Sequence, residues 1–198
     1  MKYKRLICFD FDDTLFHSPL PEEGKKIWME KTGVIWPYRG WWGRSESIGF
    51  TKEGDRITFI DANGKERPIF DIPKNEWIYQ KYLDSVAEKE TTGETYIILA
   101  TGRLNKAPGM REGIQSILRE NNLELDEVHL NWGEDTFAFK CKLFEKMIDK
   151  VGAEKFTMYD DRQEHLPKFE DWAKSQKIEI TIVDAVNKTE KTFNKKTI

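Results

Sequence analysis

Residues 5–16 read RLICFDFDDTLF, and this stretch decides the fold that the sequence predicts. Its first part is a short apolar run without polar alternation, which is typical of a strand buried on both faces of a parallel sheet. Asp10, Asp12 and Asp13 follow directly, where the predicted strand ends. We therefore expect this strand to present a cluster of carboxylates at its carboxyl end.

Two later strands are also predicted to end in polar clusters. The apolar run at 95–101 continues into Gly102 and Arg103, and the run at 155–159 continues into Asp160 and Asp161. Ligands of an open parallel sheet bind beyond the carboxyl ends of its strands, so the three clusters should converge. The carboxylates of Asp10, Asp12, Asp160 and Asp161 would repel one another when brought together, and a hard, oxygen-preferring ion such as Mg²⁺ is the natural neutralising group.

The second half of the chain alternates between strand and helix patterns. Strands are predicted at 95–101, 126–131, 155–161 and 178–184, and amphipathic helices at 112–121, 136–151 and 163–176. This alternation predicts an α/β fold, a Rossmann-like three-layer α/β/α sandwich with a parallel sheet. The polar segment 187–198 is expected to be weakly ordered or to form an edge element.

The segment between the first two strands is too long for a simple crossover, so we expect an insertion there. Residues 57–60 and 68–72 are typical of hairpin strands around a turn at 62–64, and helices are expected at 22–31 and 75–88. We predict a catalytic core of residues 1–17 and 91–198, and a small β-rich cap at 18–90 that carries these helices and the hairpin.

The spacing of the first acidic cluster suits phosphoryl chemistry. Asp10 and Asp12 can point the same way as the chain leaves the strand, so one carboxylate can attack phosphorus while the other protonates the leaving oxygen. Thr101 offers a hydroxyl to phosphoryl oxygens, and Gly102 allows close backbone approach. Lys140, on the predicted helix 136–151, can offset the charge of the nucleophile and the transferred group.

Four segments resemble, in the same order, the four motifs of the haloacid dehalogenase (HAD) superfamily: FDFDDTLF at 9–16, IILATGR at 97–103, TFAFK at 136–140 and MYDDR at 158–162. The resemblance implies a phosphatase with Asp10 as nucleophile and Asp12 as general acid and then base. It also implies that Thr14 supports the loop and that Thr101 and Lys140 hold the phosphoryl group. Mg²⁺ would be bound by Asp10, the Asp12 carbonyl, Asp160 and Asp161, with either Asp160 or Asp161 binding directly and the other directly or through water.

A finer resemblance concerns the substrate. DDTLFHSPLP at 12–21, GWW at 40–42 and YDDRQEHLPKFEDW at 159–172 are similar to the HAD domain of Swiss army knife RNA-repair proteins, and the last segment also resembles polynucleotide kinase-phosphatases. This implies removal of a terminal phosphate, 3′ or cyclic, from single-stranded RNA or DNA ends. The sequence has no GxxxxGK[ST] loop, so any kinase or ligase partner activity would lie on separate proteins.

Several residues have two interpretations. Lys142 competes with Lys140 for the helix-borne role, and Lys140 is favoured because it follows Phe139 as in the superfamily pattern. Arg103 is expected either to grip a substrate phosphate or to pair with a carboxylate of the cap.

The aromatic stretch of the cap also has two interpretations. Trp41 and Trp42 are expected either to stack on a base, with Arg39 or Arg44 on the phosphate backbone, or to form a small core under the hairpin.

Composition limits the classes of function. The net charge of −3 provides no general basic field, so a nucleic-acid substrate would need a local basic patch. Cys8 and Cys141 form no disulfide framework, and no apolar run approaches the roughly 20 residues of a membrane span. We expect a cytoplasmic protein without membrane contact.

Together these patterns predict a Mg²⁺-dependent phosphomonoester hydrolase that acts through an aspartyl-phosphate on nucleic-acid ends. Two alternatives remain, a small-molecule phosphatase such as a nucleotidase and a non-catalytic phosphate-binding module. Turnover of phosphorylated oligonucleotides, mononucleotides and generic phosphates separates the three.

Overall fold

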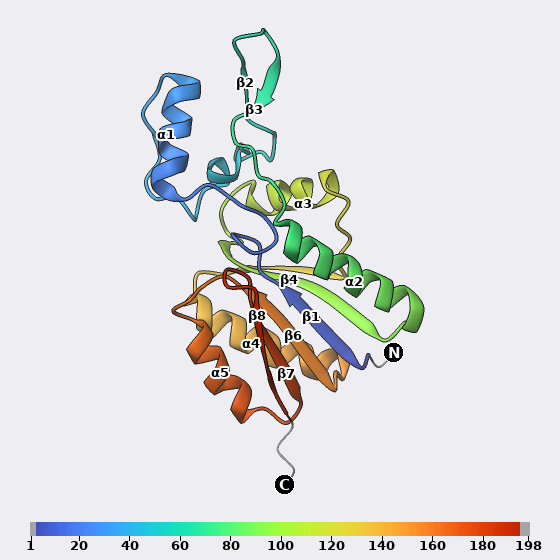
Figure 1. Ribbon diagram of the computed structural model, residues 1–198. Helices are drawn as coiled ribbons and strands as arrows, with labels where there is room; N and C mark the ends of the chain where they lie inside the picture. Colours follow the sequence, from blue (N-terminus) through green and yellow to red (C-terminus); the bar gives the residue numbers. More distant parts are fainter. Residues whose placement is uncertain (1–2, 195–198) are drawn as a thin grey trace.

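A computed structural model describes residues 3–194, and its centre is a six-stranded sheet with the order β5-β4-β1-β6-β7-β8 (Figure 1). Strands β5, β4, β1, β6 and β7 of this sheet are parallel, and β8 is an antiparallel edge strand beside β7. The strands are β1 (Arg5–Phe9), β4 (Thr95–Leu104), β5 (Glu127–Asn131), β6 (Lys155–Asp160), β7 (Glu179–Asp184) and β8 (Thr189–Phe193). Part of the 187–198 segment thus forms the expected edge element; residues 1–2 and 195–198 lie outside the described range.

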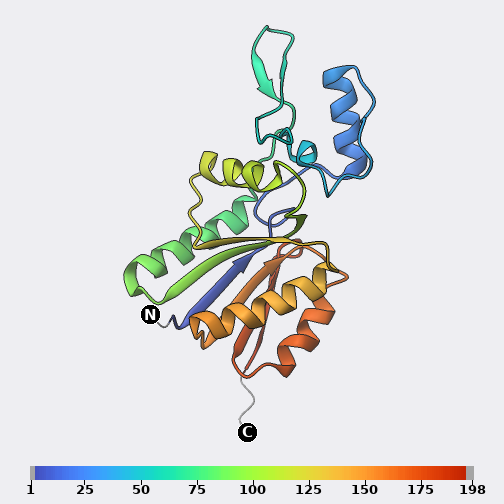
Figure 2. The ribbon, with the colours of Figure 1, turned by 180° about the vertical axis from the view of Figure 1, so that it is seen from behind.

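The central strand β1 explains the layering. Its Ile7 and Phe9 belong to one hydrophobic core, and its Leu6 and Cys8 belong to another, because successive side chains of a strand point to opposite faces. Figures 1 and 2 show the helices on these two faces, α2 (Glu76–Thr92) and α3 (Met110–Glu120) on one, α4 (Thr136–Val151) and α5 (Leu166–Ser175) on the other. The predicted three-layer, Rossmann-like α/β fold is confirmed.

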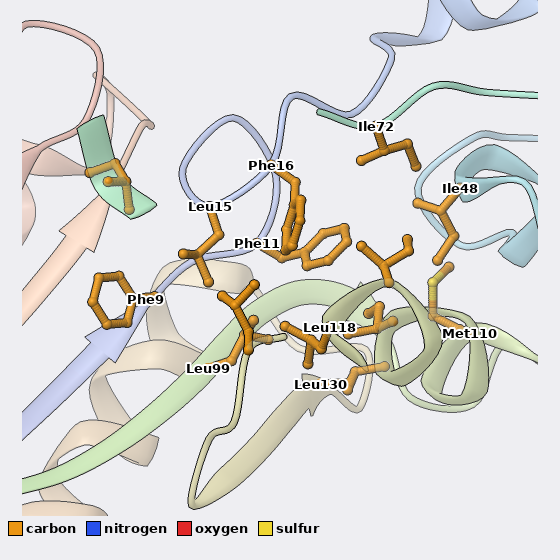
Figure 3. Close-up of a cluster of buried hydrophobic side chains, with 14 of the residues drawn as sticks. Phe9, Phe11, Leu15, Phe16, Ile48, Ile72, Leu99, Met110, Leu118 and Leu130 are labelled. Carbon is orange, nitrogen blue, oxygen red and sulfur yellow. The ribbon is translucent and has the colours of Figure 1, made fainter. Parts of the chain in front are cut away.

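The cap stands beyond the carboxyl end of the sheet (Figure 1). It contains α1 (Pro21–Thr32), the short 3-10 helix η1 (Ser45–Ile48) and the hairpin strands β2 (Thr58–Ile60) and β3 (Glu66–Pro68). The base of the cap packs on α3, and Figure 3 shows Ile48 beside Met110. Gly113 of α3 permits this contact, because a Cβ there would lie 2.9 Å from the ring of Phe50.

Two features of the cap differ from the sequence prediction. Helix α2 lies on the sheet against β4 and buries Ile78 and Tyr82 in the core, so the inserted part ends near residue 74 rather than at 90. Each hairpin strand has only three residues. Ile69 and Phe70, which we expected in the second strand, are buried among apolar side chains instead, so the cap contains less strand than predicted.

None of the helices within residues 3–194 combines the length and apolar character needed to cross a membrane.

Candidate active site

The ends of β1 and β6 and the helix α4 bring three charged side chains together. Asp10 follows β1, Asp160 ends β6, and Lys140 lies in the second turn of α4. The Lys140 Nζ atom is 2.5 Å from Asp160 Oδ2 and 3.1 Å from Asp10 Oδ1, and all three residues are buried. The exposed Lys142 pairs with Glu134 instead, so geometry favours Lys140 for the helix-borne role.

Asp161 adds a third carboxylate to this group. Asp10, Asp160 and Asp161 each offer an oxygen, and these oxygens all lie within 4.8 Å of one another. Burial, followed by the charge of neighbouring carboxylates, raises the pKa of Asp10 to about 6 against the attraction of Lys140. Burial and the charges of Asp10 and Asp160 raise the pKa of Asp161 to about 8. The cluster therefore resists full ionisation unless further positive charge is added.

A divalent cation fits this donor set. The Asp10 Oδ1 atom is buried without a hydrogen-bond donor, although Lys140 lies beside it. Both Asp160 oxygens already accept hydrogen bonds, Oδ2 from Lys140 Nζ and Oδ1 from the Arg162 backbone N–H. In contrast, no side chain among residues 3–194 donates a hydrogen bond to the Asp161 carboxylate. Asp10 and Asp161 are therefore the better placed side-chain ligands. When ionised, the carboxylates of Asp10, Asp12, Asp160 and Asp161 exceed by two charges the cations paired with them, Lys140 and Arg103, and this excess suits Mg²⁺.

The carboxylate of Asp12 is held by an arginine rather than by this cluster. Arg103 Nε lies 3.0 and 2.9 Å from the two Asp12 oxygens, and Arg103 Nη2 lies 2.7 Å from Oδ1. The hydroxyl of Ser18 also donates to Asp12, and Arg103 Nη1 donates to Ser47 Oγ. Of the two interpretations of Arg103, the structure shows pairing with a carboxylate, but this carboxylate is that of Asp12 and not one of the cap.

The backbone around Asp10 and Asp12 separates the acids from the apolar core. Phe11 is fully buried, and its ring centre lies 5.2 Å from that of Phe16. Figure 3 shows the two rings next to each other. Asp13 adopts a left-handed backbone with φ 48°, a conformation that Asp tolerates better than most residues. The chain thus turns sharply after Asp12, so that Asp10 and Asp12 both line the cavity described below.

The two threonines of the motifs are buried, and the glycine is exposed to the cavity. Thr14 has no exposed surface, and its hydroxyl makes no hydrogen bond with the described residues. Thr101 is equally buried, and its hydroxyl accepts the Arg103 backbone N–H. Gly102 lies so close to the side chain of Thr136 that an added Cβ would be 3.0 Å away. Only Gly102 of these three therefore lines the cavity, which agrees with close backbone approach of a ligand.

A cavity of about 590 Å³ opens above these residues. Core and cap both contribute to its walls, so a ligand here would touch both. Its lining residues are Asp10, Asp12, Asp13, Leu20, Trp42, Gly102, Arg103, Asp161, Arg162, Gln163 and Glu164.

The two neighbouring tryptophans of the cap have opposite environments. Trp41 is 4% exposed, packs on Trp36 and Phe70, and donates its indole N–H to the Pro19 carbonyl. This environment favours the core interpretation for Trp41. Trp42 is 38% exposed and lines the cavity, which leaves its ring available to a ligand.

Arg44 lies away from the cavity lining. Its guanidinium is 5.5 Å from the ring centre of Tyr38, and its Nε donates to the Arg39 carbonyl. The expected contact of Arg44 with a substrate backbone is therefore not supported by the cavity that contains Asp10.

We expect Trp41→Ala to lower the free energy of unfolding by about 3–5 kcal/mol, because it removes a large ring from a packed site. Trp42→Ala should change it by less than about 1 kcal/mol, because its ring is partly in solvent. Chemical denaturation of both variants tests this. Equal losses would mean that Trp42 also belongs to the cap core.

Sequence reasoning missed Ser18 and Ser47, which hold Asp12 and Arg103, and also Leu20, Gln163 and Glu164 in the cavity wall. Ser47 lies in η1, 56 positions along the chain from Arg103, and no local pattern links the two residues. Ser18 lies only six positions after Asp12, but nothing in the pattern shows that its hydroxyl turns back to that carboxylate. The available signals were the segment 12–21, which contains Ser18 and Leu20, and the segment 159–172, which contains Gln163 and Glu164.

A family model, HAD domain family 1 in Swiss Army Knife RNA repair proteins, matches residues 18–197. The match begins after the acidic motif of residues 10–14, so the motif and its geometry are separate observations that agree with it. A search of curated proteins finds no match to the chain. Because the family model covers most of the sequence, the chain belongs to HAD domain family 1 of the Swiss Army Knife RNA repair proteins.

Proposed function

We propose that the protein is a Mg²⁺-dependent phosphomonoester hydrolase that forms an aspartyl-phosphate on Asp10. Membership in the HAD domain family supports a hydrolase of the phosphatase type. The observation that carries the proposal is the placement of Asp10, with a buried oxygen beside Lys140, in the same cavity wall as Asp12. A nucleophile, a proton donor and a fixed positive charge then surround one position for phosphorus.

The reaction has two steps. An Asp10 oxygen attacks phosphorus, the bond from phosphorus to the leaving oxygen breaks, and Asp12 gives that oxygen a proton. Asp12 then accepts a proton from water, the water oxygen attacks phosphorus, and the bond to Asp10 breaks, which releases inorganic phosphate. Lys140 stabilises the negative charge beside Asp10 in both steps. Mg²⁺, held by Asp10 and Asp161 with Asp160 beside them, would supply Lewis-acid stabilisation of the phosphoryl oxygens.

The substrate that we propose is the terminal phosphate of a nucleic-acid strand. The matched family is described from RNA repair proteins. The cavity wall also combines an aromatic ring, Trp42, with a cation, Arg162. Aromatic rings stack on unpaired bases and arginines contact phosphates, so this pair suits a single-stranded end.

A substrate panel tests the proposal. RNA and DNA oligonucleotides with 3′, 5′ or cyclic terminal phosphates are compared with matching mononucleotides and with an aryl phosphate, in Mg²⁺ and in a chelator. We expect Mg²⁺-dependent turnover with oligonucleotide ends preferred. Faster turnover of mononucleotides would identify a small-molecule phosphatase. No turnover of any substrate, with phosphate binding retained, would identify a binding module.

We expect Trp42→Ala to raise the KM for a single-stranded oligonucleotide about tenfold, since stacking on one base contributes roughly 1–3 kcal/mol. The KM for an aryl phosphate should change much less. Trp132→Ala is the matched control, because Trp132 is 68% exposed but is not part of the cavity lining. An equal effect of Trp42→Ala on both substrates would argue against base stacking.

A further inference from the structure

Arg103 carries a charge in an almost fully enclosed place. Its side chain is 1% exposed, although the residue belongs to the cavity wall. Burying an unpaired guanidinium is strongly unfavourable, so the position of its partners is closely fixed. Its partners are the Asp12 carboxylate and the Ser47 hydroxyl, at 2.6 Å from Nη1.

The geometry of the Arg103–Asp12 pair restricts rotation of the carboxylate. Nε and Nη2 of Arg103 approach the Asp12 oxygens side by side, at 2.7–3.0 Å, as in a two-point arginine–carboxylate pair. The Ser18 hydroxyl donates to the same carboxylate from another direction. Turning Asp12 away would leave a buried arginine without its counter-charge.

The same contacts link Asp12 to the cap. Ser47 lies in η1 at the base of the cap, and Ser18 lies on the segment that leads from the core into the cap. The ring of Trp42 is 5.2 Å from the Arg103 guanidinium, so Trp42 is a second cap residue, beside Ser47, that contacts this arginine. The position of Asp12 therefore depends on how the cap sits on the core.

We propose, on the basis of the proposed function, that Arg103 is a positioning residue that aims Asp12 at the leaving oxygen and connects it to the cap through Ser47. This differs from a phosphate clamp, because the guanidinium is committed to Asp12 and Ser47 and is nearly without exposed surface. Misplacement of a catalytic group by about 1 Å can reduce a rate by roughly 100-fold.

Leaving-group dependence tests this role. An alkyl phosphate needs a proton on its leaving oxygen, whereas a dinitrophenyl phosphate does not, and kcat/KM reports the step in which that bond breaks. We expect Arg103→Met to lower kcat/KM for the alkyl ester at least about tenfold more than for the dinitrophenyl ester. Asp12→Asn should show the same selective loss, and the double variant should show little further loss.

The other outcomes overturn the inference. Equal losses for both esters would indicate a general structural role, and a rise in KM that is equal for both would indicate a phosphate clamp. Arg111→Met is the matched control, since Arg111 binds Asn105 and the Val128 carbonyl and makes no contact with Asp12. It should leave the ratio of the two kcat/KM values unchanged.

Ser47→Ala keeps the inference testable if Arg103→Met does not fold. It removes the hydrogen bond from Arg103 to the cap and leaves the Arg103–Asp12 pair in place. We expect a smaller selective loss on the alkyl ester, and no selective loss would overturn the link to the cap. Inactivity of the wild-type protein on both esters would instead contradict the proposed function itself.

Discussion

Replacing Asp10 by Asn is expected to lower kcat to less than about one-thousandth of the wild-type value while the protein stays folded. An amide of the same shape fits the buried position beside Lys140, but it cannot attack phosphorus and form the aspartyl-phosphate. Hydrolysis of an aryl phosphate in Mg²⁺, with circular dichroism as the check of folding, measures this. Retained activity would contradict the assignment of the nucleophile.

Asp13→Asn is the matched control for this variant. Asp13 lies three residues further along the chain, and its carboxylate is directed to His17 at 3.7 Å. Asn also tolerates the left-handed backbone that this position requires, with φ 48°. We expect its activity to stay within a few-fold of wild type, so a large loss in Asp10→Asn alone would reflect the position of the carboxylate.

Asp10→Asn should also change how the thermal stability of the protein depends on pH. Burial, above all, raises the pKa of Asp10 to about 6, above its value in the unfolded chain. Stability from the protonated carboxyl is therefore present at low pH and is lost as pH rises through about 6. In the presence of a chelator, the melting temperature should fall between about pH 5 and about pH 8, and this fall should be smaller for Asp10→Asn than for the wild type. An identical pH dependence would contradict this.

The sequence was sufficient for the sheet and for the ends of its strands. The acidic clusters follow apolar runs directly, and parallel strands place their carboxyl ends at one edge of the sheet, so the sequence predicted that Asp10 and Asp160 would lie near each other. Lys140 could be placed because it follows Phe139, and Phe139 packs in the core beneath α4.

Other features depend on tertiary contacts that no local pattern encodes. Trp41 and Trp42 are adjacent in an irregular segment, so periodicity could not show that one is buried and the other lines the cavity. Neither interpretation of Arg103 named Asp12, because Asp12 is 91 positions away in sequence. The helix α2 has the pattern of any amphipathic helix, which does not reveal whether it covers the cap or the sheet.

Lys140→Met should combine loss of activity with a large loss of stability. The methionine fills a similar volume, but Asp10 and Asp160 lose the one ammonium group that lies between them. Breaking a buried ion pair by removing one partner lowers the free energy of unfolding by about 3–5 kcal/mol. Lys142→Met, two positions along the same helix, removes an exposed pair with Glu134 and should cost less than about 1 kcal/mol.

The pH dependence separates lost charge pairing from lost packing. Without Lys140, the ionised buried carboxylates of Asp10 and its neighbours destabilise the folded protein. Protonation at low pH removes their charge and with it this destabilisation. In chelator, the stability difference between Lys140→Met and wild type should therefore be larger near about pH 8 than near about pH 5. Urea denaturation at the two pH values measures it. If the difference in the free energy of unfolding is the same at both pH values, or is no larger than that caused by Lys142→Met, Lys140 only fills space. That outcome would contradict the charge pairing on which the proposed site depends.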